Sequence, residues 1–229
     1  MKLTTRLLRK FGLAAQGDAP AAAPERVLSE HDFYEDLFVN NPLWNKKTPN
    51  VDESARWERI RRLLDRHFKP APGCRILDVG CGRGWLTNLL SRYGDAVGIE
   101  PIEPVVEHAR RMFPALRFEI ATPATFAGTE AFDLVVSSEV LEHVTDKAGF
   151  VADLRRLLKK EGLLVVTTPR GELYDQWSRK FGKPSQPVEE WISTGELTAL
   201  LRRGGFELLE SATAHEMDIY QIHACRRSS

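Results

Sequence analysis

Hydrophobic residues between positions 75 and 168 occur in short runs that alternate with longer amphipathic stretches. Short apolar runs bounded by turn-forming residues predict strands, and apolar residues at helical spacing predict helices. The predicted strands are 75–80, 96–100, 116–121, 132–138 and 162–168, and the predicted helices are 84–93, 103–112, 147–159 and 194–203. This alternation is typical of a parallel sheet flanked by helices.

Two further apolar runs, 206–213 and 219–226, follow the last helix with only a short turn between them. Strands joined by a short turn pair antiparallel, because a parallel pair needs a long crossover connection. We therefore expect a closing antiparallel hairpin, which distinguishes this chain from an ordinary doubly wound nucleotide-binding fold. Ser193 and Glu196 form a capping box that predicts the start of the preceding helix.

Two helices are predicted ahead of the first strand, at 29–40 and 53–68, with a turn-rich loop at 40–50 between them. A chain of 229 residues is most often a single domain. We predict that this domain covers residues 27–229 and that its helices within 27–70 form a cap.

Residues 1–26 are predicted to be a flexible tail. The stretch 12–24 is rich in Ala, Gly and Pro and cannot bury enough apolar surface to hold one shape. If residues 2–11 were helical, their apolar side chains would lie opposite four basic ones and would make weak contact with an anionic membrane surface. A disordered tail without this contact is the alternative.

Composition narrows the class of protein. Lys and Arg total 32, as do Asp and Glu, so no global field attracts nucleic acid. No apolar stretch approaches the roughly 20 residues that span a bilayer, and the first residues lack the apolar core of a secretory signal. Cys74, Cys81 and Cys225 form no CxxC pair and are interpreted as packed thiols in a reducing compartment. A cytoplasmic protein, either monomer or homodimer, is expected.

A glycine-rich run at 78–84 joins the first predicted strand to a helix. Glycines allow the backbone to approach a ligand without obstruction by Cβ, and the helix start offers free N–H groups. A dinucleotide fingerprint counted from Gly80 and Gly82 requires a third glycine where Trp85 stands. The spacing therefore argues against NAD and favours a smaller nucleoside without a pyrophosphate. Asp78 would either hold the ligand's ammonium group indirectly or order the turn.

The second predicted strand ends in Glu100, directly before Pro101. A ribose bound at the strand ends would present two hydroxyls there, and a carboxylate can accept both hydrogen bonds. The alternative is a tight glycine turn with Glu100 as a solvated charge. The glycine run, its strand and helix context, and Glu100 together favour the nucleoside site.

Four segments resemble the class I S-adenosylmethionine-dependent methyltransferases, and most nearly the ubiquinone-biosynthesis O-methyltransferase group. They are ILDVGCGRG at 76–84, GIE at 98–100, FDLVVSSEVLEHV at 132–144 and LLKKEGLLVVTTP at 157–169. The resemblance covers roughly residues 55–225. It implies S-adenosylmethionine as cofactor and an α/β fold, a Rossmann-like three-layer sandwich. Its seven-stranded sheet would be mostly parallel with an antiparallel last strand.

The resemblance also implies how the cofactor is held. The glycine motif would lie against the methionine part, Glu100 would bind the ribose, and Ile102 would form an apolar wall beside the adenine. Family members often carry an Asp after the third strand, but here Thr122 or backbone must serve. The cofactor-binding set is predicted to be Asp78, Gly80, Cys81, Gly82, Gly84, Glu100, Pro101, Ile102, Thr122, Ser138 and Glu139.

Glu139, Glu142 and His143 follow the strand 132–138, at the carboxyl edge where open α/β sheets bind ligands. In one interpretation the three side chains coordinate a divalent cation such as Mg²⁺, as in similar E-x-x-E-H methyltransferases. The cation would then lower the pKa of a substrate hydroxyl. In another, His143 acts alone as general base. In a third they are structural. A fourth ligand is not evident, since His215 lies far along the chain.

Substrate contacts are expected from the first helix, with His31, Phe33 and Tyr34, from the loop 40–50 and from the insert after the fifth strand. That insert places Tyr174, Trp177 and Phe181 at helical spacing, either to cover a pocket or, as we favour, as ordinary core contacts.

We expect methyl transfer to an oxygen, or less readily a nitrogen, of a small molecule. An RNA 2′-O-methyltransferase is the alternative, supported by the E-x-x-E-H string but opposed by the neutral charge. A non-catalytic cofactor-binding protein is a third hypothesis, opposed by the intact residues Gly80, Gly82, Gly84 and Glu100.

Overall fold

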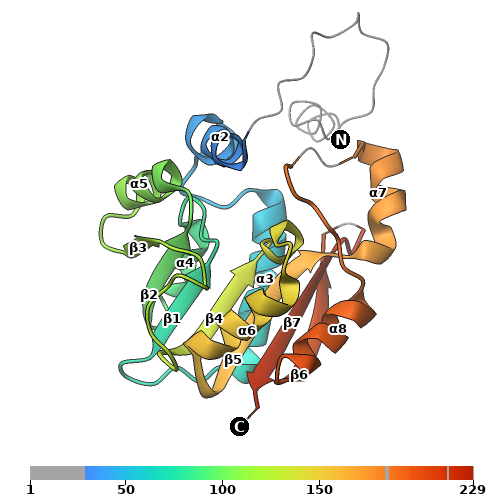
Figure 1. Cartoon of the computed structure of the whole chain (residues 1–229). Helices are drawn as coiled ribbons and strands as arrows, with labels where there is room; N and C mark the ends of the chain where they lie inside the picture. Colours follow the sequence, from blue (N-terminus) through green and yellow to red (C-terminus); the bar gives the residue numbers. More distant parts are fainter. Residues whose placement is uncertain (1–28, 184–185, 216, 229) are drawn as a thin grey trace, which may run out of the picture.

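The structure, a computed structural model, describes residues 29–183, 186–215 and 217–228. A seven-stranded sheet in the order β3-β2-β1-β4-β5-β7-β6 lies between helices on both faces (Figure 1). The strands are β1 (Arg75–Val79), β2 (Asp95–Glu100), β3 (Arg117–Ile120), β4 (Phe132–Ser138), β5 (Leu158–Pro169), β6 (Phe206–Ala214) and β7 (Tyr220–Arg227). β7 runs antiparallel to both β5 and β6, which confirms the predicted sheet and its closing hairpin. The predicted tail at 1–26 and the amphipathic stretch at 2–11 lie outside the described residues.

The helical segments follow the predicted order. They are α2 (Glu30–Glu35), the π-helical η1 (Asp36–Asn40), α3 (Val51–His67), α4 (Trp85–Leu90), α5 (Glu103–Met112), the 3₁₀ turn η2 (Leu141–His143), α6 (Lys147–Leu157), the 3₁₀ turn η3 (Gly171–Leu173), α7 (Tyr174–Phe181) and α8 (Thr194–Arg203). The capping box of Ser193 and Glu196 is confirmed, and a second one, formed by Asn50 and Glu53, starts α3. Because its cap is Asn50, α3 begins two residues earlier than the apolar spacing predicts. No helix of the described residues is long and apolar enough to cross a bilayer.

The predicted boundary between the helix 147–159 and the strand 162–168 is wrong. α6 ends at Leu157 and β5 begins at Leu158. The register between β4 and β5 shifts after Leu158, and Glu161 has a positive φ of 58°. A bulge of this kind takes up extra residues within a strand, so a polar stretch that resembles a helix end belongs to the sheet.

Helices pack on both faces of the sheet through layers of apolar side chains. On one face α6 and α8 pack on the strands through residues such as Leu154 and Leu197, and on the other α3 and α4 pack through residues such as Ile60 and Leu90. Strands covered on both faces become continuous apolar runs, which explains why the sequence pattern located them. The three cysteines are buried, as expected of packed thiols.

Candidate functional site

The predicted site residues gather at the carboxyl edge of the parallel strands, the upper edge of the sheet in Figure 1. The glycine turn follows β1, Glu100 ends β2, and Glu139 to His143 follow β4. Parallel strands bring these ends together. α2 lies above this edge and α7 beside it (Figure 1).

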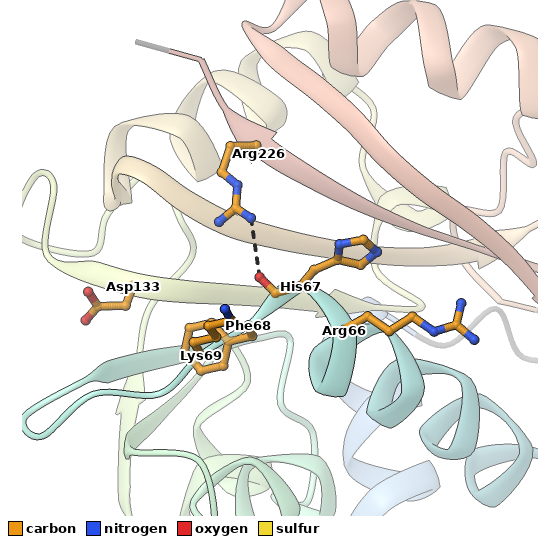
Figure 2. Close-up of a pocket in the computed structure, with 6 residues that line it drawn as sticks. All are labelled: Arg66, His67, Phe68, Lys69, Asp133 and Arg226. Carbon is orange, nitrogen blue, oxygen red and sulfur yellow. Dashed lines mark hydrogen bonds between the residues drawn. The ribbon is translucent and has the colours of Figure 1, made fainter.

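A pocket of about 450 Å³ lies at the opposite edge, where β4 begins and the antiparallel β7 ends. Two of its charged groups are already bonded within the fold: Arg226 donates to the carbonyl oxygen of His67 at 3.3 Å (Figure 2), and Asp133 pairs with Lys159 at 2.9 Å. The lining residues are Arg66, His67, Phe68, Lys69, Asp133 and Arg226. None of these is a predicted site residue, so the pocket is separate from the candidate site.

The glycine turn adopts a backbone that other residues resist. Gly82 has a φ of 50°, and a Cβ added to it would lie 3.3 Å from the ring of Phe38 in η1. A Cβ on Gly84, at a φ of 86°, would lie 2.7 Å from the ring of Phe118. The left-handed backbone and the close neighbours explain why glycine occupies these positions. The turn thus has no side chains of its own at these positions to obstruct a ligand.

Glu100 lies directly beside this turn. Its Oε2 accepts the Gly82 N–H at 3.3 Å and its Oε1 accepts the Ile102 N–H at 3.2 Å. The side chain is buried, and burial raises the pKa of its carboxyl to about 7. Thr122 follows Ala121, whose N–H donates to the Glu100 carbonyl. The fold thus assembles the expected ribose acid with the glycine turn on one side and the expected adenine contacts on the other.

Asp78 supports the turn from within. Its carboxylate is 1% exposed and accepts the hydroxyl of Thr87, in α4, at 2.6 Å. Burial raises the pKa of this carboxyl to about 7. Of the two roles left open by the sequence, this geometry favours ordering the turn; an indirect role toward the ligand's ammonium group stays a prediction.

Arg83, which sequence reasoning missed, fastens the turn to the N-terminal helices. The side chain is fully buried, and its Nη1 and Nη2 donate to the two carboxylate oxygens of Glu53 at 2.7 Å each. Its guanidinium also donates to the carbonyl oxygens of Lys46 and Thr48, at 2.6 and 3.2 Å. Such bidentate pairs fix geometry as well as charge. The loop 40–50 is therefore a connection held against the glycine turn. The sequence signal that could have pointed to this contact is the capping-box pattern of Asn50 and Glu53.

His143 is held in one tautomer by the backbone. Its Nδ1 lies 2.7 Å from the carbonyl oxygen of Val188. A carbonyl can only accept, so Nδ1 carries the hydrogen and Nε2 keeps its lone pair. Burial lowers the pKa of the imidazole. The ring is therefore a neutral proton acceptor, with Nε2 3.7 Å from Oε1 of Glu142.

Buried Glu142 and half-buried Glu139, which both follow β4, are bonded to threonines of β5. Glu142 accepts the hydroxyl of Thr168 at 2.9 Å, and Glu139 accepts that of Thr167 at 2.7 Å. Burial raises the pKa of both carboxyls. Glu139 has a φ of 59°, an uncommon conformation for a residue with a side chain. Ser138 completes the group, with its Oγ 2.9 Å from Oγ1 of Thr167.

The described residues do not fit a metal ion. Within residues 29–183, 186–215 and 217–228, no group of three His, Cys, Asp or Glu side chains is arranged to hold one. Thr167 and Thr168 each donate to one carboxyl of the candidate ligand set, and His215 pairs with Asp52 at 3.0 Å. The predicted Mg²⁺ site at Glu139, Glu142 and His143 therefore gains no support from their geometry.

The first helix contributes Tyr34 to the site. Its ring stacks on Phe38 with 6.1 Å between centroids and meets the His143 ring edge-on at 6.0 Å. Its hydroxyl donates to Oε1 of Gln186 at 3.2 Å. Burial, together with the charges of Glu142 and other acids, raises the pKa of this phenol. Tyr34 thus lies where a substrate contact was expected, whereas His31 is about half exposed.

The aromatic residues of α7 do not belong to the core, contrary to our favoured interpretation. The helix has no buried residue and stands away from the sheet (Figure 1). Tyr174 and Trp177 contact Trp191 at centroid distances of 5.3 and 5.4 Å. Helical spacing was correctly recognised, but these rings cluster with one another beside the carboxyl edge.

Comparison with known proteins supports this description. Residues 51–211 match a family model described as a methyltransferase domain. A ubiquinone biosynthesis O-methyltransferase of Methylocella silvestris is 37% identical over 127 residues, covering 48% of this chain and 50% of that protein. Its mitochondrial counterpart from Bos taurus is 41% identical over 150 residues, covering 60% and 40%. The chain therefore spans about half the length of these curated relatives or less.

Solved structures show the same fold. The N-methyltransferase NodS of Bradyrhizobium japonicum, in complex with S-adenosylhomocysteine, superposes with a TM-score of 0.70 at 17% identity, covering 87% of this chain and 99% of that one. An S-adenosylmethionine-dependent methyltransferase of Mesorhizobium loti superposes with a TM-score of 0.63 at 20% identity, covering 78% and 100%.

Proposed function

Because this chain belongs to the methyltransferase domain family, we propose that it transfers the methyl group of S-adenosylmethionine to a hydroxyl oxygen of a small molecule. The hydrogen bond from His143 Nδ1 to the Val188 carbonyl carries the proposal, since it leaves Nε2 as a proton acceptor. A hydroxyl must lose its proton as it attacks, whereas a neutral amine can attack directly. The names of the curated relatives support the same acceptor atom.

The residues around the glycine turn would hold the cofactor. Glu100 would accept the ribose hydroxyls, and the turn from Gly80 to Gly84 would lie along the methionine part. Pro101, Ile102 and Thr122 would border the adenine, and Ser138 and Glu139 would close the β4 side. When bound, S-adenosylmethionine supplies a methyl group on a positively charged sulfur.

The residues around His143 would take up the proton that the acceptor hydroxyl loses. Nε2 accepts it from the acceptor hydroxyl, and the new positive charge is stabilised by the Val188 carbonyl at Nδ1. Tyr34 and Phe38, in the N-terminal cap that we propose for residues 27–70, cover this edge and exclude water. General base catalysis of this kind contributes typically about 10²- to 10⁴-fold to the rate.

The acceptor atom can be identified from the product. The full chain is incubated with tritium-labelled S-adenosylmethionine and fractions of a cell extract, and the labelled product is characterised by mass spectrometry and NMR. We expect a methyl ether. A labelled N-methyl compound, RNA or protein as the main product would contradict the proposal. The Gly82→Val variant serves as the control for labelling that does not depend on this site.

A further inference from the structure

Arg56, in α3, is a buried arginine that forms no ion pair within 4.0 Å in the part of the chain that the structure describes. The residue is 7% exposed, and its Nε is buried without a hydrogen-bond partner. Its guanidinium lies over the ring of Tyr220, whose centroid is 4.6 Å away. The donors at the edge of the guanidinium are left for another partner.

Arg83 shows how this fold satisfies a buried arginine. That side chain donates to both oxygens of Glu53 and to two carbonyl oxygens. A buried N–H group without such a partner loses its bonds to water and gains none in return. A buried donor left unbonded at a ligand-binding edge is therefore a candidate for binding a ligand.

Three carboxylates act on the Arg56 charge without bonding to it. Burial lowers the pKa of this guanidinium, but attraction to Glu139 and, more weakly, to Glu53 and Asp52 outweighs burial and raises the pKa. All three acids have other partners: Glu139 accepts the Thr167 hydroxyl, Glu53 binds Arg83, and Asp52 pairs with His215. Arg56 therefore stays charged, and its hydrogen-bond donors are not consumed.

The strand order places Tyr220, the ring that Arg56 contacts, away from the glycine turn. The glycine turn follows β1 and Glu100 ends β2, whereas Tyr220 begins β7, three strands from β1. At about 4.8 Å per strand, this separation is about 14 Å along the edge. His143 and Glu139 follow β4, between the two. A group held by Arg56 would thus lie on the acceptor's side of the reacting centre.

We propose that Arg56 binds a carboxylate of the methyl acceptor, at a subsite that it forms with Tyr220 on the β7 side of Glu139. This inference rests on the proposed function and narrows its substrate to hydroxylated carboxylic acids. A guanidinium presents paired N–H groups that match the two oxygens of a carboxylate. Glu139, Glu53 and Asp52 act on the same guanidinium, so they repel a group with a single negative charge less than a phosphate dianion.

Benzoate and benzamide, which share a shape and differ in charge, provide the probes. They are titrated into the full chain saturated with S-adenosylhomocysteine, and the arginine Nε–Hε resonances are followed by NMR. We expect benzoate, but not benzamide, to shift the Arg56 resonance. Arg56→Met should lower the affinity for benzoate at least tenfold. Arg59→Met removes an exposed charge from the same helix and should not change this affinity.

A structural role for Arg56 gives a different result. Whatever its effect on the ligand-free protein, Arg56→Met should abolish the rise in melting temperature that benzoate gives the wild type. Equal binding of benzoate to wild type and Arg56→Met, or equal binding of benzoate and benzamide, overturns the subsite. Methyl transfer is measured separately on the same proteins. Charge-selective binding at Arg56 without any O-methylated product supports the subsite and contradicts the proposed function.

Discussion

Replacing Gly82 by valine is expected to lower the affinity for S-adenosylhomocysteine at least a hundredfold while the chain remains folded. Gly82 has a φ of 50°, where a β-branched residue is strongly disfavoured. A Cβ there would lie 3.3 Å from the Phe38 ring, and the Gly82 N–H that donates to Glu100 would be displaced. The valine side chain would therefore occupy the turn and also disturb Glu100, the proposed ribose-binding residue. Isothermal titration calorimetry measures the affinity directly.

Gly73→Val is the matched control for backbone strain. Gly73 also has a positive φ, of 78°, but a Cβ added there would have no atom within 4 Å. It precedes β1, at the edge opposite the candidate site. Similar losses of stability in the two variants, with loss of ligand in Gly82→Val alone, would locate the effect at the cofactor. Unchanged affinity in Gly82→Val would contradict the assignment of the turn.

Replacing His143 by glutamine is expected to lower kcat by about 10²- to 10⁴-fold, the range of a lost general base. The affinity for S-adenosylhomocysteine should stay within a few-fold of wild type, because the predicted cradle does not include this side chain. His31→Gln, on the half-exposed surface of α2, is the control for loss of an imidazole as such. Initial rates with an identified acceptor give kcat and KM separately.

The pH profile separates a base from a positioning residue. The imidazole must be neutral to accept a proton, so the wild-type rate is present at high pH and falls as pH drops through the His143 pKa. Burial lowers that pKa below its ordinary value of 6.5, so the fall is expected at more acidic pH than for a free imidazole. His143→Gln should lose this step. If His143→Gln keeps a nearly normal kcat, or keeps the fall in rate at acidic pH, the positioning of the two substrates alone accounts for transfer.

Local patterns in the sequence predicted most of the fold. The strand 132–138 and the helices 103–112 and 194–203 have the predicted bounds, because each is set by its own periodicity and caps. The start of β5 was predicted wrongly, since residues 159–161 are polar and are joined to the rest of the strand through a bulge. Hydrophobic periodicity predicts an element when one of its faces is buried, and the polar start of β5 has no buried face.

The candidate site depended on contacts that sequence spacing does not encode. The bond from His143 to the Val188 carbonyl joins residues 45 apart, and Arg83 and Glu53 are 30 apart. The metal hypothesis rested on suitable residue types close together in the chain. The sequence did not show that the hydroxyls of Thr167 and Thr168 donate to the two carboxyls of that set. Arg56 was passed over because an arginine in an amphipathic helix is usually exposed.

A crystal structure of the chain with S-adenosylhomocysteine tests the central claim most directly. Both ribose hydroxyls should lie within hydrogen-bond distance of Glu100, with the methionine part along the turn from Gly80 to Gly84. The sulfur should lie nearer to His143 than to Arg56. A ligand in the pocket of Figure 2, or one at the carboxyl edge that leaves Glu100 without a contact, would contradict the account.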